Sequence, residues 1–241
     1  MSRSTILTAR EGEIVRILRI LGTESNRFVL VGGYAVNALA PHRFSVDCDL
    51  VINQETVPAI VQILKREGYA REPGVSKKSR SRVENYTKSL EQGKADVDLY
   101  VDRLTSRQTD GAWGYEFMQK NSIEAIVAGV TGSAQSRVAS RELLTALKLH
   151  AGRDQDMADI VVLSERIDWE SVAAFAACGS RKKVESQLAS ELQLLDEKKF
   201  ISDLKSQFGL RADITPLIRG TSEGLKKVQS MLSNQSFRET L

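Results

Sequence analysis

The sequence predicts an α/β domain over residues 1–130 and an all-helical domain over residues 131–241. Residues 28–52 contain an apolar run, two glycines, a short helical stretch and a second apolar segment, a pattern typical of strand–turn–helix–strand structure. Residues 95–102 alternate strictly between polar and apolar side chains, which predicts another strand. From Ala139 onward the apolar residues recur with the helical period, which places the helical domain at the C-terminal end.

The composition is that of an ordinary globular protein. Of the 241 residues, 41% are hydrophobic and 27% are charged, and the formal net charge of +3 permits a nucleic-acid partner without favouring one. The apolar runs are too short to span a bilayer and Met1–Ser4 does not begin a signal peptide, so we expect a cytoplasmic protein with no membrane partner. Cys48 and Cys178 are far apart and lack the spacing of metal ligands, and Cys48 should be buried.

Helices and strands are predicted on either side of residues 28–52. Thr8 and Glu11 have the spacing of a capping box, which predicts that a helix begins there. Residues 54–67 form a second predicted helix. Residues 81–90 could form an edge strand within the basic segment 71–94, which either holds phosphates or an RNA backbone or is a solvated hairpin.

The remaining elements follow from local signals. Residues 111–121 are predicted to form a loop in which Trp113 fills a hydrophobic gap, and residues 123–130 a short strand. In the helical domain, Asp168 is placed to cap a helix. His42 and His150 are not spaced as metal ligands, and His42 is expected to be a plain turn residue.

The glycines and aspartates within residues 28–52 carry the clearest chemical signal. Gly32 and Gly33 lie where the first strand meets a helix, and a backbone without side chains there lets N–H groups and the helix dipole meet an anion such as phosphate. Alternation places Asp47 and Asp49 on one face of the second strand. Two carboxylates this close are costly unless a divalent cation lies between them. The stretch therefore predicts a site for a metal-complexed triphosphate.

This arrangement resembles the signature of the nucleotidyltransferase superfamily related to DNA polymerase beta, in which a Gly-Gly turn precedes Asp-x-Asp on a strand. More narrowly, it is similar to the AbiEii-like (abortive-infection) toxin nucleotidyltransferases, through Gly32-Gly33-x-Ala35 and Arg43-x-Ser45-x-Asp47-x-Asp49-Leu50. The resemblance implies a nucleotidyltransferase fold with a mixed sheet flanked by helices. It also implies transfer of a nucleoside monophosphate from an NTP to an acceptor hydroxyl, with Mg²⁺ or Mn²⁺ as cofactor.

The same resemblance implies roles for individual residues. Asp47 and Asp49 would bind the metal, and a third carboxylate on a neighbouring strand would complete the site and take the proton of the attacking hydroxyl. Asp98 is our choice for that role and Asp96 is the alternative, whereas the plain reading is a strand with a solvated face. The residues expected to contact the nucleotide in this half of the chain are Gly32, Gly33, Arg43 and Ser45.

A second motif lies in the helical domain. Lys148 and Asp159 are eleven residues apart, close to three helical turns, so they should lie near one face of a helix, with Asp156 close to that face and Arg153 further round. The pattern resembles the second AbiEii-like signature, except that Gln155 stands where that family usually has lysine. The resemblance implies that Lys148 reaches the triphosphate and that Arg153, Asp156 and Asp159 belong to the same site. The alternative without a catalytic role is a surface helix whose charged side chains form ion pairs with one another.

The resemblance suggests a toxin-type enzyme that modifies the acceptor end of tRNA and is paired with a cognate antitoxin. The residues themselves do not name the acceptor. One alternative keeps the chemistry and changes the acceptor to a small molecule, such as an antibiotic, or to a protein. Two others are a non-catalytic nucleotide- or RNA-binding module on the same fold, and a helical interaction protein, which would leave the glycine turn unexplained.

Overall fold

The structure is a computed structural model that describes residues 3–25, 27–72 and 82–234. The chain divides into two compact units, which are described separately. The first comprises residues 1–105 and 113–140, and the second comprises residues 106–112 and 141–241. Residue 130, where the sequence places the end of the α/β domain, lies in a hairpin turn of the first unit.

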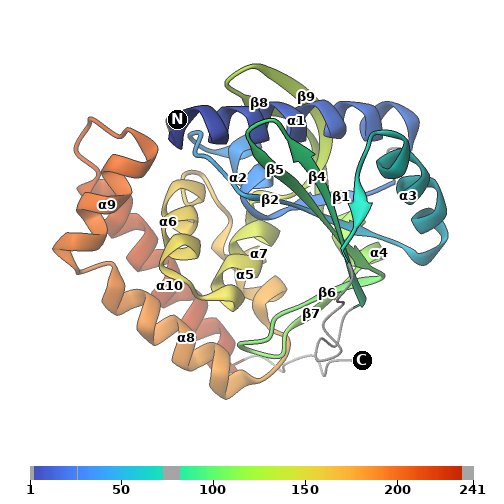
Figure 1. Cartoon of the computed structure of the whole chain (residues 1–241). Helices are drawn as coiled ribbons and strands as arrows, with labels where there is room; N and C mark the ends of the chain where they lie inside the picture. The colour runs from blue at the N-terminus through green and yellow to red at the C-terminus, as the bar shows by residue number, and fades with distance from the viewer. Residues whose placement is uncertain (1–2, 26, 73–81, 235–241) are drawn as a thin grey trace. The chain divides into compact units, whose positions relative to one another are not determined.

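The elements up to residue 140 are a mixture of helices and strands (Figure 1). In chain order they are α1 (Arg3–Glu24), β1 (Val29–Val31), α2 (Gly32–Leu39), β2 (Asp47–Ile52), the 3-10 turn η1 (Gln54–Thr56), α3 (Val57–Arg66), β3 (Ala70–Arg71), β4 (Arg82–Leu90), β5 (Gly93–Val101), β6 (Arg103–Thr105), β7 (Ala112–Gly114), α4 (Tyr115–Lys120), β8 (Ser122–Gly129) and β9 (Gly132–Ala139).

Seven of these strands form one sheet in the order β3-β4-β5-β2-β1-β9-β8, and β6 and β7 pair separately. The large sheet is mixed, as expected. β2 pairs with β5, and β1 with β9, in parallel, while the other neighbours are antiparallel. The parallel pair β2–β5 places Asp47 beside Asp96 and Asp49 beside Asp98. Because side chains alternate along a strand, all four aspartates lie on one face of the sheet.

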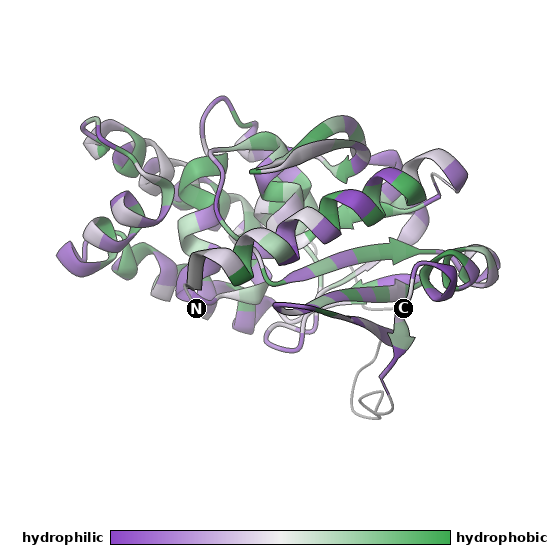
Figure 2. Ribbon diagram, turned by 45° about the horizontal axis from the view of Figure 1, so that its top comes forward, coloured by the Kyte–Doolittle hydropathy of each residue, from purple (hydrophilic) through white to green (hydrophobic). Residues whose placement is uncertain are grey.

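Helix α1 covers the opposite face. Lys88 of β4 is paired with Ala95 of β5, so it lies on the face of the buried side chains Val97 and Cys48. From there its Nζ reaches Glu13 Oε1 of α1 at 3.0 Å. Figure 2 shows hydrophobic and hydrophilic residues alternating along α1, as expected for a helix that packs one side on a sheet. The predicted burial of Cys48 is confirmed.

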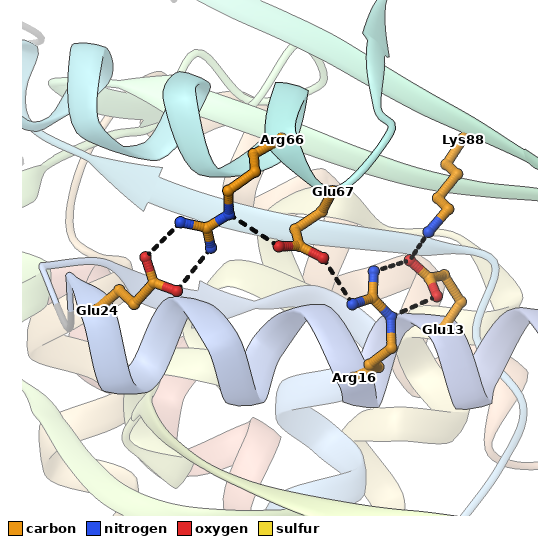
Figure 3. Close-up of polar contacts among 6 residues, drawn as sticks. All are labelled: Glu13, Arg16, Glu24, Arg66, Glu67 and Lys88. Carbon is orange, nitrogen blue, oxygen red and sulfur yellow. Dashed lines mark hydrogen bonds and ion pairs between the residues drawn. The ribbon is translucent and has the colours of Figure 1, made fainter.

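A chain of ion pairs joins α1 to α3 (Figure 3). Arg16 of α1 binds Glu13 and Glu67 at 2.8 Å each, and Glu67 also accepts a hydrogen bond from Arg66 at 3.0 Å. Arg66 in turn binds Glu24 near the end of α1 at 2.6 Å. Single exposed ion pairs contribute little to stability, but a network that connects two helices helps fix where they lie on the sheet.

The second unit is helical, as predicted. Its helices are α5 (Arg141–Ala151), α6 (Asp154–Leu163), α7 (Trp169–Ala176), α8 (Arg181–Leu194), α9 (Lys198–Phe208) and α10 (Thr215–Asn234). Asp168 caps α7 by accepting hydrogen bonds from the N–H groups of Glu170 and Ser171, as its position predicts. Helix α10 packs so closely on α7 that a Cβ at Gly224 would clash with the ring of Trp169.

Several local expectations were wrong. Thr8 and Glu11 do not begin a helix, because α1 already runs through them. β4 is not an edge strand, since β3 lies outside it, and the part of the basic segment at residues 73–81 lies outside the described residues. The predicted loop at 111–121 contains β7 and α4, although Trp113 is buried as expected.

The sequence also gave no sign of β9. Its residues Gly132–Ala139 include glycine, glutamine, arginine and two serines, so no alternation of apolar side chains marks it. β9 nevertheless lies inside the sheet, between β1 and β8. Among the described residues, no helix combines the length and the apolar character needed to cross a membrane.

Candidate active site

The glycine turn packs directly against the aspartate strand. Gly32 has φ +67, a left-handed conformation that favours glycine, and it begins α2 immediately after β1. The preceding residue, Val31, is paired with Asp49. A Cβ at Gly32 would therefore clash with Asp49 Oδ2, and one at Gly33 would clash with Ser45 Oγ. Both glycines are required by close approach, because the N-terminus of α2 packs directly against Asp49 and Ser45.

The four aspartates differ in their surroundings. Asp47 is exposed, Asp49 and Asp98 are half-buried, and Asp96 is 9% exposed. Asp96 Oδ1 accepts a hydrogen bond from Thr87 at 2.6 Å and lies 3.2 Å from Lys94 Nζ. Its charge is thus already neutralised within the protein.

Asp98 has a different set of neighbours. Its Oδ1 accepts one hydrogen bond, from Asn85 Nδ2 at 2.6 Å. Burial raises the pKa of Asp98, and the nearby charge of Asp47 raises it further, whereas the hydrogen bond from Asn85 opposes the rise. Tyr100 OH donates to Asp49 Oδ1 at 3.3 Å from the same face of β5. Asp102 does not continue this face, because it leaves the strand at φ 65 and its carboxylate accepts from Gln54 N at 2.7 Å.

The segment between α2 and β2 carries Arg43 and Ser45 and is held by two side chains of α2. Asn37 of α2 donates to Arg43 O at 2.7 Å and accepts from Arg43 N at 3.1 Å, and Tyr34 OH donates to Ser45 O at 3.3 Å. In the sequence, Asn37 is marked only as a single amide in an otherwise apolar short helix. These bonds fix the path of the segment beside Gly33.

His42 does more than occupy a turn. Its Nε2 lies 2.5 Å from Oε1 of Glu11, a fully buried carboxylate of α1. The other oxygen of Glu11 accepts from Val130 N at 2.6 Å. Glu11 therefore ties α1 to the segment before β2 and to the β8–β9 turn. The capping-box pattern that marked Glu11 gave it a different role, because its partners His42 and Val130 are distant in the chain.

The carboxylates supply the donors that a divalent cation needs. Within the described ranges, no three His, Cys, Asp or Glu side chains come together as a closed metal-binding group. Mg²⁺ is usually held by one or two carboxylates, with substrate phosphates and water completing its six oxygen ligands. Asp47, Asp49 and Asp98 on one face of adjacent strands, beside a turn kept free of side chains, fit that requirement for Mg²⁺ or Mn²⁺.

The second motif forms a buried cluster within the helical unit. Lys148 Nζ lies 2.8 Å from Asp156 Oδ1 and 2.7 Å from Asp159 Oδ2, and both aspartates are fully buried. Arg153 Nε lies 2.6 Å from Asp156 Oδ2. The expectation that Lys148 and Asp159 share a face of one helix was wrong. The chain turns at Gly152 (φ +66), and the cluster joins the end of α5 to the start of α6.

Charge and hydrogen bonding favour the ionised form of Asp156. Although burial opposes ionisation, the hydrogen bond from Arg153 and the charge of Lys148 lower the pKa of Asp156. Gln155, which replaces the lysine of the second signature, donates to Asp159 Oδ1 at 3.2 Å. Glu191 of α8 is also buried, and neither of its oxygens has a hydrogen-bond partner among the described residues, so burial raises its pKa well above the ordinary value.

The structure thus places the predicted residues in two groups. Gly32, Gly33, Arg43, Ser45, Asp47, Asp49 and Asp98 belong to the first unit, and Lys148, Arg153, Asp156 and Asp159 belong to the second.

Comparison with known proteins identifies the fold. No protein-family model and no curated protein sequence matches the chain. Among solved structures, a proposed nucleotidyltransferase from H. pylori matches with a TM-score of 0.50 and 14% identity, covering 97% of this chain and 98% of that one.

Two further structures match more weakly. The lincosamide antibiotic adenylyltransferase LnuA, bound to lincomycin, has a TM-score of 0.46 and 20% identity over 66% of this chain and 99% of its own. A proposed nucleotidyltransferase from Thermotoga maritima has a TM-score of 0.44 and 17% identity over 64% and 89%. From the match to the H. pylori structure, we conclude that the chain has a nucleotidyltransferase fold.

Proposed function

We propose that the protein is a metal-dependent nucleotidyltransferase, which moves a nucleoside monophosphate from an NTP to an acceptor hydroxyl. The observation that carries the proposal is the register of β2 and β5 beside the glycine turn, with Asp49 paired to Asp98 and packed against Gly32. A fold alone does not imply an activity. The proposal therefore rests on these side chains and on the motifs they match.

The reaction needs binding of the triphosphate, activation of the hydroxyl and stabilisation of the leaving group. Asp47 and Asp49 would hold Mg²⁺ or Mn²⁺, which neutralises charge on the phosphates. The N–H groups of Gly32 and Gly33 at the start of α2, with Ser45 and Arg43, would bind phosphate oxygens. The acceptor oxygen attacks the α-phosphorus, its proton passes to Asp98, and the bond to the β-phosphate breaks to release pyrophosphate.

Asp98 is proposed for the proton transfer in preference to Asp96. Asp96 is nearly buried and already paired with Lys94 and Thr87. Asp98 is more accessible, and its Oδ1 accepts a hydrogen bond from the uncharged Asn85 instead of pairing with a cation.

Lys148 is proposed to offset the charge of the leaving pyrophosphate, the role that the resemblance implies. Its two carboxylate partners would hold the ammonium in one orientation. Arg153, Asp156 and Asp159 would then act by positioning Lys148. If the cluster were only structural, its loss would change stability without a separate effect on turnover.

The acceptor is proposed to be the end of a tRNA, with the protein acting as a toxin that a cognate antitoxin restrains. Support comes from the two motifs alone. A small-molecule acceptor such as an antibiotic, or a protein acceptor, would use the same carboxylates. A non-catalytic nucleotide- or RNA-binding module is the remaining alternative, and it would have no need for three carboxylates at adjacent positions.

The test is incubation of the protein with each α-labelled NTP, Mg²⁺ and total tRNA. Asp49→Asn removes a proposed metal ligand at nearly constant volume, and Asp203→Asn changes an exposed aspartate of α9 as the matched control. We expect label on tRNA with the wild type and the control, and none with Asp49→Asn.

The outcomes separate the alternatives. If tRNA is not labelled but NTP binds in the presence of Mg²⁺, the acceptor would be a small molecule or a protein. The same assay would then be repeated with acceptors of those two classes. Equal labelling by Asp49→Asn and wild type would contradict the assigned site. Absence of NTP binding would contradict the proposal that the protein is a nucleotidyltransferase.

A further inference from the structure

The seven-stranded sheet has two unlike edges. One is β3, a strand of two residues, and the other is the eight-residue β8. β8 pairs only with β9 in the described part of the chain, and its register runs without a bulge from Ser122, opposite Ala139, to Gly129, opposite Gly132. The outer side of β8 therefore presents a row of unpaired backbone N–H and C=O groups, which is a template for another strand.

β8 lacks the features that usually prevent edge pairing. Its sequence, SIEAIVAG, contains no lysine, arginine or proline. Its single charged residue, Glu124, is paired with Arg137 of β9 at 2.9 Å. Natural proteins place charges, prolines or bulges on exposed edges to block association. Over eight residues β8 has no proline, no bulge and a single charge that is already paired, which indicates an edge that is paired when the protein is assembled.

The exposed apolar side chains gather at the same place. Five large hydrophobic residues are exposed among the described residues, and three of them lie on β8 or directly after it. Ile126 is 64% exposed, Ile123 45% and Val130 63%. Alternation puts Ile123 and Ile126 on opposite faces of the sheet, so an added strand would cover apolar surface on both faces.

We propose that β8 pairs antiparallel with β8 of a second copy of the chain, so that the two sheets become continuous across a homodimer. A two-fold axis at Ile126 places it opposite Ile126 of the partner subunit and places Glu124 opposite Ala128 of the partner subunit. No like charges meet in this register. A two-fold interface must be complementary to itself, and a nearly neutral strand of apolar and small residues meets that requirement.

The same features favour a second copy over a different protein as the occupant. Specific pairing with a foreign strand is commonly selected by complementary charges and pockets. The only charge on β8 is already neutralised within the subunit by Arg137. What remains for recognition is backbone hydrogen bonding and apolar contact, both of which an identical strand provides.

Sedimentation velocity over a range of protein concentrations tests the proposal. The wild type should sediment as a dimer. Ile126→Lys places two ammonium groups opposite each other at the axis, so it should weaken the dimer by at least about tenfold. Gln135→Lys is the matched control, because Gln135 is paired with Ile126 on β9, and it adds the same charge to the same face one strand away from the edge.

A cross-linking variant tests the register. Cys48 and Cys178 are buried, so Ile126→Cys adds the one cysteine on this edge, and mild oxidation should give a disulfide-linked dimer. Gln135→Cys should not cross-link. A monomeric wild type at all concentrations would overturn the proposal, as would a dimer that Ile126→Lys and Gln135→Lys affect equally or one that Ile126→Cys fails to cross-link. Equal circular dichroism and thermal unfolding of the variants would show that each one folds.

Discussion

The carboxylate of Asp49 occupies the space that a side chain on Gly32 would need. This relationship packs the turn proposed to bind phosphate directly against the strand proposed to bind metal. It also makes glycine necessary at position 32 for two separate reasons, the left-handed backbone and the close approach.

Gly32→Ala should therefore reduce activity more than it reduces stability. The left-handed conformation costs alanine about 1–2 kcal/mol, and the clash displaces Asp49 in addition. Gly209→Ala is the matched control, since Gly209 has φ +61 and a Cβ there meets nothing within 4 Å. Urea unfolding should show a loss of about 1–2 kcal/mol for Gly209→Ala and more for Gly32→Ala. Nucleotide transfer should fall only in Gly32→Ala, and normal transfer in that variant would contradict the site.

Asp98→Asn and Asp96→Asn should separate the two candidates for the third carboxylate. Each change keeps the side-chain volume and an acceptor oxygen. Loss of a general base lowers turnover by about 10²–10⁴-fold, so Asp98→Asn should show a fall of that order. Asp96→Asn should have a much smaller effect, because it alters a group already paired with Lys94. Single-turnover assays of both variants decide the point, and the reverse order of effects would assign the role to Asp96.

Lys148→Met should destabilise the helical unit strongly. It leaves Asp156 and Asp159 buried without their cation, and breaking a buried pair in this way costs about 3–5 kcal/mol. Arg153→Met is the control, since the side chain of Arg153 is 70% exposed and its loss should cost about 1 kcal/mol or less.

Activity measured on the folded fraction then distinguishes the two roles of Lys148. If Lys148 acts in transfer, turnover per folded molecule falls in Lys148→Met under conditions where NTP binding is still saturated. Unchanged turnover per folded molecule would make the cluster purely structural.

His150 should make stability depend on pH. It is buried, its Nε2 donates to Ala176 O at 2.9 Å, and Thr109 OH donates to Nδ1 at 2.5 Å. Burial lowers the pKa of His150 from 6.5 to about 4, although the bond to Ala176 opposes the shift. Between these two values only the unfolded chain is protonated at this residue. The free energy of unfolding should therefore fall as pH drops below 6.5, and the fall should level off near pH 4.

The loss assigned to His150 amounts to about 2 kcal/mol between about pH 7.5 and about pH 5. Urea unfolding across that range measures it. His150→Gln should be less stable at neutral pH, but its free energy of unfolding should depend less on pH. In His42→Gln the part of the pH dependence that arises from His150 should remain. An unchanged acid slope in His150→Gln would assign that slope to other groups.

The parts of the site that the sequence predicted share a physical basis. The turn at Gly32 and the strands of Asp49 and Asp98 are marked by local rules, since glycine permits the left-handed conformation and alternation assigns side chains to faces. These rules act within a few residues. They therefore located the two strands without showing that Asp49 and Asp98 are paired.

The features that the sequence did not reveal depend on contacts distant in the chain. The sequence of β9 is mostly polar and small. It is a strand because it pairs with β1 and β8 on either side. The local pattern around Glu11 did not indicate its partners, His42 and Val130, since they lie far away in the chain. The two-helix arrangement around Lys148 arises at Gly152, within a stretch that was expected to be one helix.

The parallel pairing of β2 with β5 has a consequence for the order of assembly. The glycine turn and Asp47 and Asp49 leave the ribosome together, whereas Asp98 belongs to a strand that reaches β2 only after α3, β3 and β4 have been made. Contacts so distant in sequence form late, because the entropy of closing a long loop is lost before they form. The proposed site is therefore incomplete in any nascent chain that ends before β5, because such a chain lacks Asp98.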